Sequence, residues 1–148
     1  MAQSIYDDVI LDHIKNARNY RELPDASRRA EGVNPLCGDT FTVYLALEGE
    51  RIRDAAFQCS CCGISMASAS VMTGLVRERS LREAAAMVAH FKALVRRPQD
   101  AADDIDPGQQ AVLSVVKASP SRGNCAVLAW HTLDAALKGE TSTTLDGE

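Results

Sequence analysis

The sequence lacks three features that mark other classes of protein. It has no basic excess, because 16 Lys and Arg residues face 20 Asp and Glu residues, for a formal net charge of −4. A nucleic-acid surface usually carries a basic stripe, so no nucleic acid is expected as a partner. No apolar run approaches the roughly 18 residues that a membrane span needs, and the first eight residues lack the pattern of a signal peptide. We therefore expect an acidic, cytoplasmic protein that does not enter a membrane.

Five cysteines are present, and they fall in three separate places. Cys37 lies in a turn, Cys59, Cys61 and Cys62 follow a strand-like run, and Cys125 begins the last long helical segment. In a reducing compartment a disulfide framework is improbable, and the odd number of cysteines agrees with this. Metal binding or thiol chemistry is the better interpretation. Distant cysteines at the ends of elements indicate a site that the fold assembles.

Apolar periodicity predicts strands early in the chain and helices late. Alternation over 40–47 predicts a strand, and a turn at 48–51 leads to a returning strand at 52–58. Residues 18–36 are polar and rich in turn formers, and they are expected to form a loop. This order favours an α+β fold in which helices pack on an antiparallel sheet.

Helical spacing of apolar residues predicts five helices. Ser4 and Ser65 are expected to cap the first two, and a capping box that begins at Ser80 starts the third. Residues 139–148 are small and polar, and they are expected to be a disordered tail. The expected helical segments are 5–17, 66–76, 81–95, 109–116 and 125–138, with a polar excursion at 96–108.

The tripeptide Cys37-Gly38-Asp39 strengthens the metal interpretation. Glycine permits a tight turn, and Asp39 can point to the same side as Cys37 in an extended segment. With Cys62 and Cys125 these residues make a Cys₃Asp set, four donors that suit tetrahedral zinc. Asp39 is the hardest ligand of the four and the one most easily displaced by an incoming sulfur. The alternatives are that Asp39 is a turn residue and Cys125 a small core residue.

Three other features permit more than one interpretation. Cys59-Ser60-Cys61-Cys62 contains a C-x-x-C pattern typical of redox dithiols, but the strand order does not supply the βαβ units of a thioredoxin. Small side chains at a crowded strand end are the favoured interpretation of Cys59 and Cys61. Arg122 can pair with a thiolate or persulfide, or it is a solvated loop arginine. His13 lies on an apolar stripe and is expected in the core or against a partner.

Four segments together resemble the IscU/NifU-like family of iron–sulfur cluster assembly proteins, and specifically its SufU-type branch. They are residues 10–19, 34–39, 62–70 and 125–130, which occur in family order. Two features favour the SufU-type branch: Asn124 stands where IscU-like proteins carry a histidine, and the excursion at 96–108 resembles an insertion of that branch. Cys59 and Cys61 depart from the pattern, because relatives tend to have glycine there.

This resemblance implies a fold, a site and a partner. The fold would be one α+β domain over 1–138, with a small antiparallel sheet of about three strands and helices on one face. Cys37, Asp39, Cys62 and Cys125 would be the metal ligands, and zinc the cofactor. A cysteine desulfurase, which carries pyridoxal phosphate, would donate sulfur to Cys37.

The resemblance also leaves alternatives open. A sulfurtransferase-like carrier would pass its sulfur to downstream iron–sulfur assembly proteins. A scaffold would instead use the same residues to hold iron or a [2Fe–2S] cluster during assembly, because cysteine thiolates bind such clusters readily. A third interpretation is a structural zinc domain that only binds partners.

Overall fold

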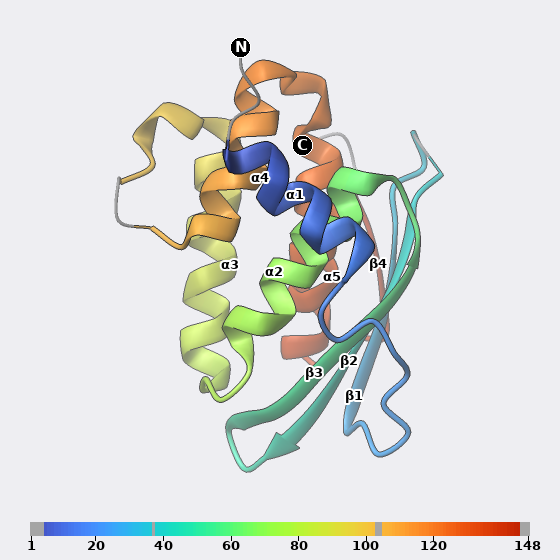
Figure 1. The fold of residues 1–148 in the computed structure, drawn as a ribbon. Coiled ribbons are helices and arrows are strands. Elements are labelled where there is room, and N and C mark those ends of the chain that lie inside the picture. The colour runs from blue at the N-terminus through green and yellow to red at the C-terminus, as the bar shows by residue number, and fades with distance from the viewer. Residues whose placement is uncertain (1–4, 37, 103–104, 146–148) are drawn as a thin grey trace.

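The computed structural model describes residues 5–36, 38–102 and 105–145, with 5–7 as backbone only. Figure 1 shows a twisted sheet with the helices gathered on one side of it. The strands are β1 (Arg28–Val33), β2 (Thr40–Glu48), β3 (Arg51–Ser60) and β4 (Ser142–Thr144). The helices are α1 (Ile5–Lys15), α2 (Gly63–Val76), α3 (Leu81–Arg96), α4 (Pro107–Ala118) and α5 (Gly123–Leu137), with 3₁₀ turns η1 (Pro98–Asp100) and η2 (Pro120–Arg122).

The sheet has the order β3-β2-β1-β4. β2 pairs antiparallel with both β1 and β3, and Gly49, at a φ of 62°, makes the tight turn between β2 and β3. β4 pairs parallel with β1. The α+β class and the antiparallel strands are confirmed, and the parallel strand β4 is an addition to the three that were expected.

Two segments expected to be irregular contain strands. β1 lies inside the expected loop 18–36, and β4 lies inside the expected disordered tail 139–148, where Leu145 is also buried. The expectation was wrong for these residues, and 146–148 lie outside the described part of the chain. β1 buries only the small residues Ala30 and Gly32. A side chain on Gly32 would collide with Thr132 of α5, so smallness at this position lets the helix pack on the strand.

The helices differ from expectation mainly at their starts. The capping box at Ser80 is confirmed, because Ser80 accepts from the Glu83 amide and Glu83 accepts from the Ser80 amide. Ser65 does not cap α2, because Cys62 is the N-cap and Ser65 lies inside the first turn. Ser4 lies outside the described residues. Among those described, no helix is long and apolar enough to cross a membrane.

The core lies between the sheet and helices α2 and α5, and α3 and α4 extend it by packing on these two helices. Trp130 of α5 is fully buried and stacks on Phe91 of α3, with ring centroids 4.7 Å apart. Its Nε1 donates to Ser68 Oγ of α2 at 3.1 Å, and that hydroxyl donates to the carbonyl of Ala126 at 2.6 Å. These contacts hold α2 and α5 together close to their N-terminal ends.

His13 connects α1 to α2. The Ser70 hydroxyl accepts a hydrogen bond from the Arg18 amide at 2.8 Å and lies 2.7 Å from His13 Nδ1, to which it can donate its own proton. Burial lowers the pKa of His13 below 6.5, and the nearby Arg18 charge acts in the same direction. Asp12 and Asp106 oppose this shift without reversing it. The imidazole therefore stays neutral in the folded protein at neutral pH.

Acid should weaken the fold through His13. Because its pKa is lower in the folded than in the unfolded protein, the unfolded chain binds the extra proton first as the pH falls through 6.5. The contribution of His13 to stability should thus be complete above that pH and be lost below it. Urea unfolding of the wild type and of His13→Gln between about pH 7.5 and 5 measures this difference, because glutamine can accept the Ser70 proton without titrating. Equal pH dependence of the two proteins would contradict it.

Candidate metal centre

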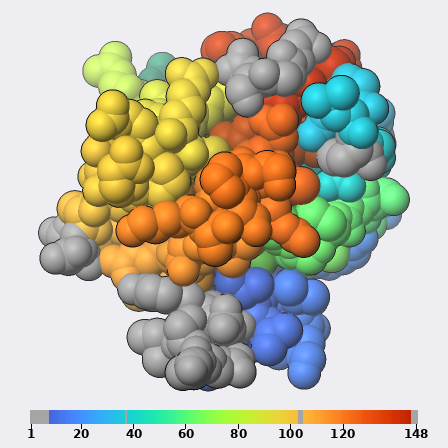
Figure 2. All heavy atoms as spheres, turned by 90° about the horizontal axis from the view of Figure 1, so that it is seen from above, coloured from blue at the N-terminus to red at the C-terminus, as the bar shows by residue number. Residues whose placement is uncertain are grey.

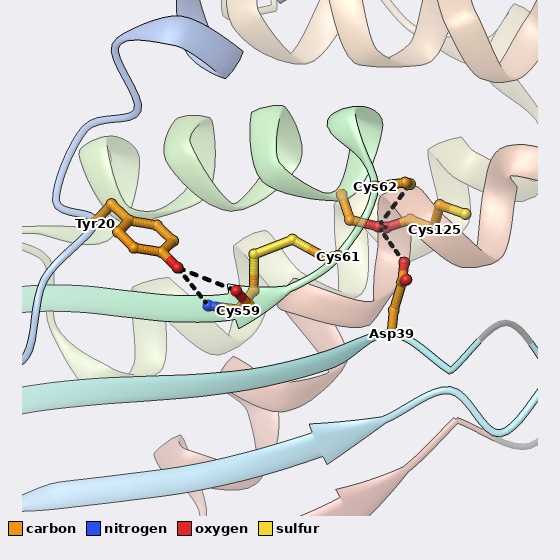
Figure 3. The surroundings of a disulfide bond; sticks show 7 residues. Tyr20, Asp39, Cys59, Cys61, Cys62 and Cys125 are labelled. Carbon is orange, nitrogen blue, oxygen red and sulfur yellow. Dashed lines mark hydrogen bonds between the residues drawn. A yellow bond between two sulfur atoms is a disulfide. The ribbon is translucent and has the colours of Figure 1, made fainter.

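Three donors from three elements converge at one end of the molecule. Asp39 immediately precedes β2, Cys62 is the N-cap of α2, and Cys125 lies in the first turn of α5. One ligand atom from each lies within 4.8 Å of the other two, and all three residues are half-buried. Figure 3 shows their side chains pointing toward one another. The fold thus brings three of the four predicted ligands together, and their role in binding a metal stays a prediction.

A closed turn places Asp39. The Asn34 amide donates to the Asp39 carbonyl at 3.0 Å, and the Gly38 amide donates to the Asn34 carbonyl at 2.8 Å. The Asn34 side chain is buried and accepts from the Leu36 amide at 3.1 Å. Gly38 has a φ of 79°, a conformation that glycine adopts without strain. The bond to the turn is made by the backbone carbonyl of Asp39, whereas its side chain accepts from Ser65, so the carboxylate faces the site.

Two helices begin at the site. Cys62 and Cys125 therefore both lie where unpaired backbone N–H groups and the positive end of a helix dipole favour negative charge. Metal-binding thiols act as thiolates, so this placement suits them as ligands. The seam between α2 and α5, held by Trp130 and Ser68, brings the two helix ends together.

Ser65 is a site residue that the sequence analysis assigned to another role. Its hydroxyl is buried and has one proton, which is shared between two acceptors, Asp39 Oδ2 at 3.1 Å and the Cys125 carbonyl at 2.9 Å. Cys62 Sγ lies 3.4 Å from the same oxygen. Ser65 thus contacts all three donor residues and orients them, as residues behind metal ligands commonly do. In the sequence, Ser65 follows Cys62 by about one helical turn, and this spacing was the signal that could have identified it as a site residue.

The donor set fits zinc. Ligand atoms bound tetrahedrally at zinc distances lie roughly 3.3–3.8 Å apart, so donors within 4.8 Å need only a small closure. Two sulfurs and one carboxylate leave one tetrahedral position for a further ligand or an incoming group. Cys37, the predicted fourth ligand, lies outside the described residues. The same sulfur-rich set also suits iron in a cluster.

Arg122 stays outside the donor cluster. It ends η2 and is exposed, three residues before Cys125. No hydrogen bond joins its side chain to Asp39, Cys62 or Cys125 among the contacts between described residues. Its predicted pairing with a thiolate or persulfide therefore stays a prediction.

Cys59 and Cys61 are joined by a disulfide. The expectations that these thiols are merely small side chains and that a disulfide is improbable were wrong for this pair, because the two sulfurs, one residue apart at the end of β3, are bonded to each other. The bond is local and encloses a single residue, so it does not staple distant parts of the chain. The pair is Cys59 with Cys61, whereas the C-x-x-C pattern suggested Cys59 with Cys62.

The donors lie next to an open face of the molecule. Figure 2 shows this face, where the cyan segment before β2, the green start of α2 and the orange segment leading into α5 meet. Leu36, in the turn that holds Asp39, is 78% exposed. Among the described residues, it is the most exposed of the large apolar side chains.

Comparison with known proteins finds one family and several close relatives. The family model for the NifU-like N terminal domain matches residues 5–126. The zinc-dependent sulfurtransferase SufU of Bacillus subtilis is 36% identical over 137 residues, covering 93% of this chain and 92% of that protein. The iron–sulfur cluster assembly scaffold protein IscU of Thermotoga maritima is 33% identical over 137 residues, covering 90% and 93%.

Solved structures resemble the fold as well. A putative iron–sulfur cluster assembly scaffold protein for the SUF system from Fervidobacterium islandicum superposes with a TM-score of 0.78 at 30% identity, covering 90% of this chain and 96% of that one. A NifU-like protein from Brucella abortus has a TM-score of 0.77 at 21% identity, covering 91% and 93%, and shows the shared fold.

Proposed function

Because this chain belongs to the family of NifU-like N-terminal domains, we propose that it serves iron–sulfur cluster assembly as a zinc-dependent sulfur acceptor in the cytoplasm. The resemblance to the SufU-type branch inferred from the four segments is confirmed. The observation that carries the proposal is the convergence of Asp39, Cys62 and Cys125 within 4.8 Å. Its sulfur donor would be the persulfide of a cysteine desulfurase, a pyridoxal-phosphate enzyme.

The residues of the site would have separate roles in zinc binding and in sulfur transfer. Bound zinc would keep its thiolate ligands deprotonated and oriented. Cys62 and Cys125, each at a helix start, would retain the metal throughout. Asp39 is the weakest ligand for a thiophilic metal and would be the one to leave. Ser65 would hold the released carboxylate by the hydrogen bond that already joins them.

The transfer itself would use Cys37. Its thiolate would attack the outer sulfur of the desulfurase persulfide, so that a new sulfur–sulfur bond forms on Cys37 and the bond to the desulfurase cysteine breaks. The desulfurase cysteine would leave as a thiolate and take up a proton. The exposed Leu36, one residue before Cys37, would lie in the contact with the desulfurase. Downstream iron–sulfur assembly proteins would then receive the sulfur.

The scaffold function is the second candidate, favoured by the IscU relative at 33% identity. The same donors would then hold a [2Fe–2S] cluster. Asn124 argues for the zinc-dependent acceptor, because it stands where a histidine could otherwise join the ligand set. An amide is a poor substitute for imidazole at a soft metal.

Anaerobic purification followed by metal analysis and a desulfurase assay tests the proposal. We expect a colourless protein with about one zinc per chain, since a Cys₃Asp set binds one ion. It should stimulate sulfide production by a cysteine desulfurase in the presence of a reductant. Cys37→Ala should lose at least about tenfold of this stimulation, because the attacking nucleophile is gone.

Ser60→Ala, a change of similar size at the neighbouring strand end, serves as the control and should stimulate like the wild type. A Cys37→Ala protein that stimulates fully would remove Cys37 from the acceptor role. A brown protein with visible charge-transfer bands would support the scaffold instead. If no cysteine carried a persulfide after incubation with desulfurase and free cysteine, the interpretation as a structural zinc domain would be supported.

A further inference from the structure

The Cys59–Cys61 pair is a redox-capable group that the proposed acceptor role does not use. Cys59 lies in β3 and Cys61 directly follows the last residue of that strand, Ser60, so a single residue separates the two cysteines. Their Cα atoms are 5.6 Å apart, inside the range that both the bonded and the reduced pair can occupy. Both residues are half-buried, so a small reactant can reach them. The pair can therefore cycle between dithiol and disulfide without rearranging the strand.

The surroundings hold the pair beside the metal centre. Ser60 is the partner of Thr40, the residue that follows Asp39, so Cys59 and Cys61 flank the position opposite the start of β2. Tyr20 fixes the backbone at Cys59, because its hydroxyl donates to the Cys59 carbonyl at 3.0 Å and accepts from the Cys59 amide at 3.5 Å. Figure 3 shows the disulfide between Tyr20 and the three donors in that view.

Cys61 and Cys59 differ in their local environment. Cys61 follows Ser60, the last paired residue of β3, and precedes the N-cap of α2. Cys59 lies inside the strand, paired with Phe41 and held by Tyr20. Cys59 is therefore the more rigidly placed of the two, and Cys61, beyond the paired part of the strand, is the one assigned to meet the incoming persulfide.

We propose that Cys59 and Cys61 form a dithiol that reduces sulfane sulfur to sulfide beside the metal centre. This inference rests on the proposed function, because its substrate is a persulfide, the form in which an acceptor of this kind receives sulfur. Incorporation into a cluster requires sulfide, which is more reduced than sulfane sulfur by two electrons. Zinc has no redox chemistry and cannot supply those electrons. Two adjacent thiols can supply both electrons by forming a disulfide.

The reaction balances in two steps. The Cys61 thiolate attacks the outer sulfur of a persulfide, forms a Cys61 persulfide and releases the donor as a thiolate. The Cys59 thiol then gives up its proton and attacks Cys61 Sγ, and hydrosulfide leaves. The sulfane sulfur gains two electrons, and the two cysteines lose two as they form the disulfide that the structure contains. A dithiol reductant of the thioredoxin class would restore the pair.

A single-turnover experiment tests this with the full zinc-loaded chain and no desulfurase. The protein is reduced, freed of reductant under anaerobic conditions and mixed with glutathione persulfide. We expect about one equivalent of sulfide per chain, together with a loss of about 2 Da from the peptide that contains both cysteines. The double variant Cys59→Ser/Cys61→Ser should release at least about tenfold less sulfide. Ser60→Ala, which keeps both thiols, should behave as the wild type.

The single variants test the order of steps. Cys59→Ser should accumulate a persulfide on Cys61, seen as a gain of about 32 Da, because the first step proceeds without the second. Cys61→Ser should accumulate none on Cys59. A persulfide on Cys59 in that variant would overturn the assigned order.

Wild-type protein that releases sulfide without forming the Cys59–Cys61 disulfide would refute the inference, whatever the variants do. So would an unchanged sulfide yield from a double variant that still binds zinc. The proposed function is judged separately, by stimulation of the desulfurase with reductant present. A double variant that keeps zinc and stimulation but loses sulfide release would support both.

Discussion

Replacing Cys62 with serine is expected to lower the affinity for zinc by at least about 100-fold. Cys62 supplies one of two described sulfur donors, and its position at the N-cap of α2 leaves little freedom for another residue to take its place. A serine hydroxyl is a much weaker zinc ligand than a thiolate at neutral pH. Competition with a chromophoric chelator under reducing conditions measures the change.

Cys59→Ser is the matched control for this experiment. It makes the same chemical change three residues earlier, on a cysteine that lies outside the donor cluster. We expect its zinc affinity to stay within about threefold of the wild type, as for a substitution that touches no ligand. A loss as large as that of Cys62→Ser would mean that Cys59 takes part in metal binding, and the assigned ligand set would be wrong.

Replacing Trp130 with alanine is expected to lower the free energy of unfolding by about 3–5 kcal/mol. The ring is fully buried between α3 and α5, and its removal leaves a cavity beside Phe91. It also removes the hydrogen bond to Ser68 that joins α5 to α2. Denaturant unfolding of the wild type and the variant gives the difference directly.

Trp130→Phe separates packing from the hydrogen bond. Phenylalanine keeps the stacking on Phe91 and most of the volume, whereas the Ser68 hydroxyl can still donate to the Ala126 carbonyl. A loss of about 1–2 kcal/mol is expected for this variant. If Trp130→Ala cost less than about 1 kcal/mol, this tryptophan would not be a main stabilising contact of the helical layer.

Local patterns predict the elements whose own residues carry the signal. β2 is recognisable because apolar side chains alternate along its sequence, and β3 because a turn leads back from β2, while the capping box at Ser80 marks the start of α3. β1 and β4 escape this kind of prediction because they bury small or few side chains. They are strands because of what they pair with: β1 lies between β2 and β4, and β4 lies along β1.

The ligand types of the site can be inferred from the sequence, because thiolate and carboxylate chemistry belongs to the residues themselves. The motifs predict Asp39, Cys62 and Cys125 as ligands. Their meeting within 4.8 Å depends on how β2, α2 and α5 pack, which no local pattern encodes. The buried hydroxyl of Ser65 and the Cys59–Cys61 bond emerge only in the folded chain. Chemical type is a local property, whereas the distances and hydrogen bonds that make a site are set by contacts between segments far apart in sequence.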